Sequence, residues 1–102
     1  MTAAHLPVML PALMEALSPR PGGLYVDLTL GAGGHSEGLL RNSAPDGQLL
    51  AFDLDAQAIE IASQRLAAFG ERLHIYHATY QTLPDALADL GWEAVDGIVS
   101  DF

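Results

Sequence analysis

The sequence predicts an α/β domain built on a parallel sheet of four strands in the spatial order 3-2-1-4, the first part of a doubly wound sheet. Apolar segments of strand length alternate with segments of helical periodicity, which is typical of βαβ units with right-handed crossovers. Turn clusters rich in glycine and proline separate these segments. The chain has 102 residues, half of them apolar, which is enough for one small domain with its own core.

The first half of the chain begins with an apolar segment at 8–17 that is expected to be helical and to end at the turn cluster 18–23. A buried strand is predicted at 24–30, and it runs directly into a glycine-rich loop that opens a short helix at about 35–43. After a Pro-Asp-Gly turn, the apolar segment 48–53 is predicted to be the second strand.

The second half repeats this alternation. Asp55 is a suitable N-cap for a helix that reaches about Phe69, and Gly70 is the expected stop. The apolar face of this helix has the spacing that packs against a sheet. The segment 73–77 is the predicted third strand.

The last helix is expected to start at Thr82, which forms a capping pattern with Asp85, and to end before Gly91. The segment 95–102 is the predicted fourth strand, and it would form an open edge of the sheet. Parallel sheets are normally continued beyond the point where the strand order reverses, so the domain is expected to be truncated after this strand.

The composition excludes several classes of protein. Thirteen Asp and Glu residues against four Arg give a formal net charge of −9, so these residues are not expected to grip a phosphate backbone by themselves. The absence of cysteine excludes disulfides, thiolate zinc sites and cysteine nucleophiles. The longest uncharged apolar run, residues 6–14, is too short and too interrupted by proline to span a bilayer. His74 and His77 are three residues apart on a strand and should face opposite sides, so no metal site is expected.

The strongest functional signal is the loop DLTLGAGGHS at residues 27–36. Glycines let the backbone turn sharply and approach a ligand closely, and the free N–H groups at a helix start favour an anionic group. In dinucleotide-binding folds the fingerprint is G-x-G-x-x-G; Gly31 and Gly33 fit it, but Ser36 stands at the third position. A tight strand–helix turn that binds nothing is the alternative interpretation of this loop.

Three further residues lie at or just after the carboxyl ends of the predicted strands, where ligands bind in such sheets. Asp53, 22 residues after Gly31, is placed to accept hydrogen bonds from both ribose hydroxyls of an adenosine cofactor, and no basic residue follows that would favour NADP. Asp55 already serves the alternative role of a helix cap. Tyr80 is placed to flank an adenine ring, or else is an ordinary loop aromatic. Asp101 ends the fourth strand near the glycine loop.

Four motifs together resemble the bacterial family of small-subunit ribosomal RNA cytosine-N4 methyltransferases. They are HLPVML at 5–10, YVDLTLGAGGHS at 25–36, DLD at 53–55 and VDGIVSD at 95–101. The resemblance covers essentially the whole chain, and the glycine-loop block with its His-Ser ending is its specific part. It implies that residues 1–102 are the N-terminal part of a Rossmann-like class I methyltransferase domain that binds S-adenosylmethionine.

The resemblance also implies a set of site residues and a reaction. The cofactor loop would be Gly33, Gly34 and His35, the ribose ligand Asp53, the adenine wall Tyr80 (where the family usually has Phe) and a cofactor-side acid Asp101. The family methylates the exocyclic N4 of a cytidine in small-subunit ribosomal RNA, which implies a bacterial cytoplasmic enzyme without a membrane or metal partner.

The resemblance to this family does not identify the catalytic residues. The family continues well beyond this segment, so contacts to the RNA or to the assembled small subunit are expected there, and this chain alone is expected to be inactive. Cytosine N4 is a poor nucleophile that needs a hydrogen-bond acceptor to orient it and take its proton. Asp101 is the one acid nominated, although a cofactor role is favoured for it.

Two other functions stay open at this stage. A non-catalytic remnant would keep the fold and some affinity for the cofactor without transferring a methyl group. An NAD-dependent oxidoreductase domain would use the same kind of sheet, but Ser36 in place of the third glycine disfavours it.

Overall fold

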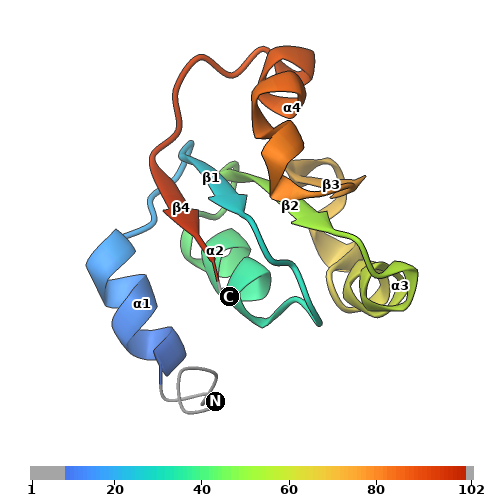
Figure 1. The fold of residues 1–102 in the computed structure, drawn as a ribbon. Helices are drawn as coiled ribbons and strands as arrows, with labels where there is room; N and C mark the ends of the chain where they lie inside the picture. Colours follow the sequence, from blue (N-terminus) through green and yellow to red (C-terminus); the bar gives the residue numbers. More distant parts are fainter. Residues whose placement is uncertain (1–8, 101–102) are drawn as a thin grey trace.

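The computed structural model describes residues 9–100, which form one parallel sheet with helices on both faces (Figure 1). The strands are β1 (Leu24–Asp27), β2 (Gln48–Asp53), β3 (Leu73–His77) and β4 (Gly97–Val99). The helices are α1 (Met9–Leu17), α2 (Gly34–Asn42), α3 (Ala56–Arg65) and α4 (Leu83–Leu90), with 3-10 segments η2 (Ala67–Arg72) and η3 (Tyr80–Thr82).

The strand order is β3-β2-β1-β4, and each neighbouring pair is parallel, which confirms the predicted topology. The register sets Val26 beside both Leu50 and Ile98 and sets Asp53 beside His77. Because all strands run in one direction, their carboxyl ends meet at one edge of the sheet. The loops that follow β1, β2 and β3 therefore lie together at this edge.

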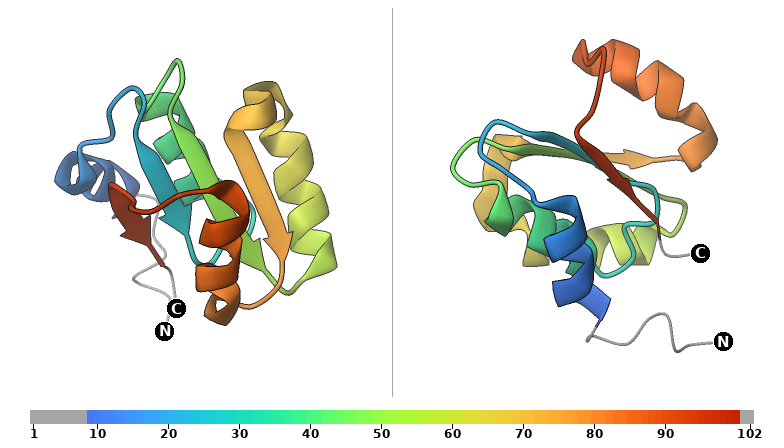
Figure 2. Two further views of the ribbon diagram at one scale, coloured as in Figure 1. Left: turned by 90° about the horizontal axis from the view of Figure 1, so that it is seen from above. Right: turned by 90° about the vertical axis from the view of Figure 1, so that its left-hand side faces the viewer.

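Two apolar clusters form the core, one on each face of the sheet. Helices α1, α2 and α3 cover one face and α4 covers the other, as the edge-on view in Figure 2 shows. Strand β2 serves both clusters, since Leu49 and Ala51 belong to the first while Leu50 and Phe52 belong to the second. All four side chains are fully buried, which explains the unbroken apolar run that predicted this strand.

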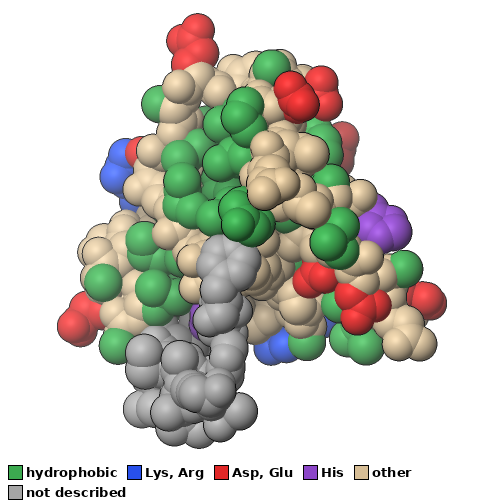
Figure 3. Space-filling view, viewed as in Figure 1, with side chains coloured by type: hydrophobic (Ala, Val, Ile, Leu, Met, Phe, Trp, Pro, Cys, Tyr) green, Lys and Arg blue, Asp and Glu red, His purple; other side chains and the backbone are tan. Residues whose placement is uncertain are grey.

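The α4 face is only partly covered. Val26 on β1 is fully buried there, whereas its register partner Ile98 on β4 is 47% exposed. Figure 3 shows hydrophobic side chains gathered on this face beside α4 and β4. Among the described residues β4 pairs only with β1, so its other side is an open edge of the sheet.

Strand β1 is shorter than predicted because its last side chain ends it. The buried carboxylate of Asp27 accepts a hydrogen bond from the Thr29 N–H at 3.0 Å, which forms a local turn directly after the strand. Leu30 then follows the neighbouring strand through one bond, from its N–H to the Phe52 carbonyl at 2.9 Å. The chain thus leaves the sheet at residue 28, three residues before Gly31.

One helix boundary and one helix cap also differ from the prediction. Helix α3 ends at Arg65, and the last predicted turn is a 3-10 segment kinked at Gly70, whose φ is 57°. Thr82 precedes α4 as predicted, but its hydroxyl donates to the Thr79 carbonyl at 2.8 Å and makes no cap bond. Gly91 ends α4 in the left-handed conformation, as expected. In the described range no helix is long and apolar enough to cross a membrane.

Candidate functional site

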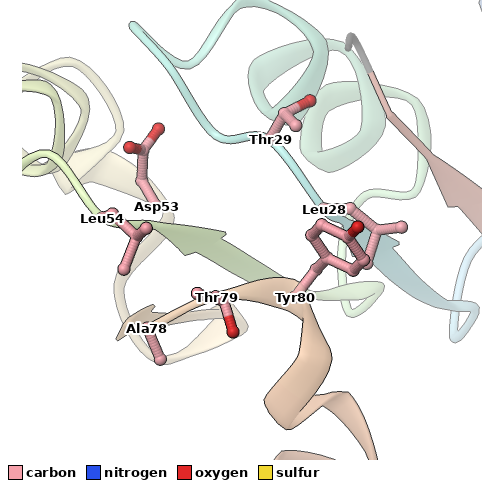
Figure 4. A pocket seen from close by; sticks show the side chains of 7 residues that line it. All are labelled: Leu28, Thr29, Asp53, Leu54, Ala78, Thr79 and Tyr80. Atoms are coloured by element: carbon pink, nitrogen blue, oxygen red, sulfur yellow. The ribbon is translucent and has the colours of Figure 1, made fainter.

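A pocket of about 230 Å³ opens at the carboxyl edge of the sheet, where the segments after β1, β2 and β3 meet (Figure 4). Among the described residues, the wall is mostly apolar; its polar groups are one carboxylate and the hydroxyls of two threonines and one tyrosine. The lining residues are Leu28, Thr29, Asp53, Leu54, Ala78, Thr79 and Tyr80. Two of the sequence-predicted site residues, Asp53 and Tyr80, therefore lie in one cavity.

The glycine loop depends on backbone conformations that other residues rarely adopt. Gly31 has a φ of 54° and Gly33 a φ of 96°, both in the left-handed region. At Gly33 a Cβ atom would also lie only 3.3 Å from the Leu66 side chain, because helix α3 packs directly against the loop. The φ of Gly33 therefore favours glycine strongly, and a side chain there would also force Leu66 to shift slightly.

The loop ends at the first turn of α2. Gly33 is the N-cap, with no side chain to accept a hydrogen bond from the helix, and Gly34 and His35 begin the helix. The first N–H groups of a helix have no intrahelical partner, so an uncapped N-terminus attracts anionic groups. The predicted loop residues thus occupy the position in α2 that suits a carboxylate or phosphate.

Asp53 holds the loop as well as lining the pocket. Its Oδ2 atom accepts a hydrogen bond from the Gly31 N–H at 2.8 Å, and its Oδ1 atom accepts one from the Asp55 N–H at 2.9 Å. Each carboxylate oxygen has a second lone pair, so the carboxylate retains capacity for ligand hydroxyls. Asp55 caps α3 through the Gln57 N–H at 2.9 Å, as predicted.

Tyr80 and Leu54 place exposed apolar surface at the pocket. Tyr80 opens η3 and is 43% exposed, while Leu54 directly follows Asp53 and is 63% exposed. Figure 4 shows the two side chains coming from different segments around the cavity. Large exposed apolar side chains beside a pocket suit an aromatic ligand.

The sixth predicted site residue, Asp101, lies outside the described residues. The strand that leads to it runs beside the loop, since Val99 is the register partner of Asp27 and its carbonyl accepts a bond from the Leu28 N–H at 2.9 Å.

Sequence reasoning assigned no role to two polar residues under the loop. Asp27 and Ser36 are both fully buried, and the Ser36 hydroxyl donates to Asp27 Oδ2 at 2.8 Å. Asp27 is the first residue of the glycine-loop motif DLTLGAGGHS. An acidic residue at the end of an otherwise apolar strand is the sequence feature that could have indicated its role. Nothing in the sequence indicated that Asp27 bonds Ser36, because Ser36 lies nine residues further along the chain.

On the outer side, a charged cluster ties the loop to α3. Arg65 donates to Glu37 at 2.8 Å and to the Ala32 carbonyl at 3.3 Å. Arg41 also donates to Glu37, and these hydrogen bonds, first from Arg41 and then from Arg65, lower the pKa of the Glu37 carboxyl. The cluster is exposed, so each ion pair adds little stability.

The histidines of β3 serve structural contacts. The ring of His74 forms a hydrogen bond of 2.8 Å with Gln48, and the ring of His77 bonds the Leu54 carbonyl at 2.9 Å. Within the part of the chain that the structure describes, no group of three or more His, Asp or Glu side chains has the arrangement of a metal site.

Several solved structures share this arrangement, and one of them is named a methyltransferase. The chain is similar to TrmN from Thermus thermophilus with a TM-score of 0.74 and 25% identity, over 92% of this chain and 27% of that one. It is similar to a protein-L-isoaspartate O-methyltransferase with a TM-score of 0.74 and 17% identity, over 92% and 28% of the two chains. The fold is therefore that of the Rossmann-like methyltransferases.

The sequence places the chain more narrowly. The sequence model of the MraW methylase family matches residues 2–102, so the chain belongs to this family. Two relatives, each named ribosomal RNA small subunit methyltransferase H, are 47% and 48% identical, from Nitratidesulfovibrio vulgaris and Geobacter sulfurreducens. The matches cover 95% and 99% of this chain but 27% and 32% of the relatives. The chain thus spans about a third of their length.

Proposed function

We propose that this chain binds S-adenosylmethionine and is the cofactor-binding part of a methyltransferase that acts on the exocyclic N4 of a cytidine in small-subunit ribosomal RNA. The observation that carries the proposal is the Asp53 carboxylate, which lines an otherwise largely apolar pocket and holds the glycine loop at Gly31. The family of the chain and the names of its relatives support the methyl-transfer reaction and the ribosomal RNA substrate.

The residues fit the three chemically different parts of this cofactor. The ribose hydroxyls would donate to the open lone pairs of Asp53, and the adenine ring would lie against Tyr80 and Leu54. The carboxylate of the methionine end would accept bonds from the uncapped first turn of α2, at Gly34 and His35. We assign Asp101 to the cofactor side of the site as well.

The charges also suit this cofactor. S-adenosylmethionine supplies an electrophilic methyl group on a cationic sulfonium centre. The chain has a net charge of −9, and among the described residues the one charged side chain that lines the pocket is the acid Asp53, so a cation is attracted rather than repelled. The residues around the pocket would bind and orient the cofactor, which is the main contribution of a protein to an in-line displacement.

RNA binding calls for a different surface. With four arginines and no lysine, this chain offers little charge to neutralise a phosphate backbone. We therefore assign the contacts to ribosomal RNA or to the assembled small subunit, and the base that accepts the N4 proton, to the remaining two thirds of the relatives' length. This chain alone would then be inactive in methyl transfer, which would take place in the bacterial cytoplasm.

The competing cofactor is NAD, whose pyrophosphate would have to sit over the same loop. A buried carboxylate, Asp27, lies beneath that loop, and Ser36 occupies the position of the third glycine. The Asp27 carboxylate would repel a doubly charged pyrophosphate more strongly than a single carboxylate, and Ser36 departs from the dinucleotide-binding fingerprint.

Titration calorimetry of the chain with S-adenosylmethionine and with NAD tests the proposal directly. We expect binding of S-adenosylmethionine and no measurable binding of NAD; preferential binding of NAD would overturn the assignment. A second assay incubates the chain with small ribosomal subunits and radiolabelled S-adenosylmethionine. Incorporation of label by this chain alone would contradict the proposal that the RNA contacts and the base lie in the remaining part of the relatives' length.

A further inference from the structure

Asp27 and Ser36 are the two polar side chains buried beneath the glycine loop, and they bond to each other. Asp27 is the last residue of β1, and Ser36 lies in the first turn of α2. The Ser36 hydroxyl donates to Asp27 Oδ2 at 2.8 Å, and the Thr29 N–H donates to Asp27 Oδ1 at 3.0 Å. One carboxylate thus joins the strand end, the start of the loop and the helix that follows.

This bond spans the base of the loop. A buried carboxylate is costly unless hydrogen bonds compensate for its lost hydration, so its place at the end of β1 calls for an explanation. The N-cap of α2, Gly33, has no side chain to hold the helix start. The hydroxyl of Ser36 therefore ties the first turn of α2 to the sheet from the inside, while the exposed Glu37–Arg65 pair ties it from the outside.

The position of Ser36 explains what its bond to Asp27 does. In a dinucleotide-binding loop the third glycine lets the helix pack closely against the strand. Here a side chain stands between the two, and its hydrogen bond to Asp27 sets their spacing. The direction of the N–H groups of Gly34 and His35 follows from this spacing, because both precede Ser36 in the same helical turn.

We propose that Asp27 and Ser36 form a positioning pair, which aims the first N–H groups of α2 at the methionine carboxylate of S-adenosylmethionine. This inference rests on the proposed function and deepens it: neither side chain touches the cofactor, and both act through the backbone of Gly34 and His35. The pair affects the amino-acid end of the cofactor and leaves its adenosine end, which belongs to Asp53 and Tyr80, unchanged.

The chain contains a matched control for the test. Ser43, at the far end of α2, is also buried; its hydroxyl donates to the Leu39 carbonyl at 2.7 Å and accepts a longer bond from Arg72 at 3.4 Å. Ser36→Ala and Ser43→Ala each remove one buried hydroxyl from the same helix. Titration calorimetry with S-adenosylmethionine and, separately, with adenosine distinguishes a positioning role from a general loss of stability.

We expect Ser36→Ala to weaken binding of S-adenosylmethionine about 10-fold or more, since a bond to a charged acceptor is lost, and to change adenosine binding less than about 3-fold. Ser43→Ala should leave both affinities within about 2-fold of the parent chain. Equal losses for the two ligands, or equal effects of the two variants, would overturn the proposal. If Ser36→Ala does not fold, Ser36→Cys, which keeps the shape but donates weakly, takes its place in the same comparison.

Failure of the proposed function would show itself differently. A parent chain without affinity for S-adenosylmethionine refutes the cofactor assignment, and the positioning pair is then judged by amide hydrogen exchange. Ser36→Ala should speed exchange in the loop that precedes α2 about 10-fold or more, and Ser43→Ala should not. Unchanged exchange in both variants would refute the positioning role.

Discussion

Asp53→Ala is the substitution that most directly tests how the site works, because the structure gives Asp53 two separable tasks. Its carboxylate accepts two backbone hydrogen bonds, from Gly31 at 2.8 Å and Asp55 at 2.9 Å, and in the proposed complex it also accepts two ribose hydroxyls. The variant should therefore lose stability and cofactor affinity together, but by different amounts.

The magnitudes follow from the surroundings of each bond. The Gly31 bond is partly buried and the Asp55 bond is exposed. We expect their loss to lower the free energy of unfolding by roughly 1–3 kcal/mol, within the range for hydrogen bonds to a charged acceptor. Loss of the two ribose bonds should weaken S-adenosylmethionine binding by roughly 2–4 kcal/mol, which is a factor of about 30 to 900 in the dissociation constant.

The neighbouring residue supplies the control. Asp55 caps α3 through the Gln57 N–H, so Asp55→Ala should cost about 1 kcal/mol of stability with little change in cofactor affinity. Urea unfolding and titration calorimetry on both variants measure the two quantities. The reasoning fails if Asp53→Ala loses stability but binds S-adenosylmethionine within about 3-fold of the parent chain, since Asp53 would then be only a clamp on the loop.

Three further predictions concern the pocket wall, the loop and the sheet. Tyr80→Ala should weaken cofactor binding by about 1–2 kcal/mol in calorimetry, whereas Tyr80→Phe, which keeps the ring, should bind nearly as the parent chain does. Gly33→Ala should lower the free energy of unfolding by about 1–3 kcal/mol, because it forces a φ of 96° on a residue with a Cβ; unchanged urea midpoints would contradict this. Burial lowers the pKa of His74, so the unfolded chain binds its proton more readily, and stability should fall as the pH drops below about 6.5. Urea titrations from pH 8 to 5 should show this loss in the parent chain and a smaller one in His74→Gln.

Much of the fold followed from local patterns. Strands β2 and β3 have the predicted bounds, because their apolar runs mirror burial within the sheet and turn residues mark their ends. The glycine loop and Asp53 were also identifiable, since a glycine-rich turn after one strand and an acid at the end of the next are sequence-local features. Their roles toward a cofactor, like that of Asp101, stay predictions.

Other features depended on contacts between residues far apart in the chain. That Asp53 already holds Gly31, 22 residues away, could not be inferred from spacing. The same is true of the bond between Ser36 and Asp27.

The sequence by itself therefore determined the order of elements, the sheet topology and the segment in which a ligand would bind. These depend on periodicity, capping and turn residues, each of which is written in a few neighbouring positions. The tertiary structure alone decided which polar groups line the pocket and which bond to other parts of the protein in its interior. That choice depends on the alignment of strands and helices to within a hydrogen-bond length, which no local pattern encodes.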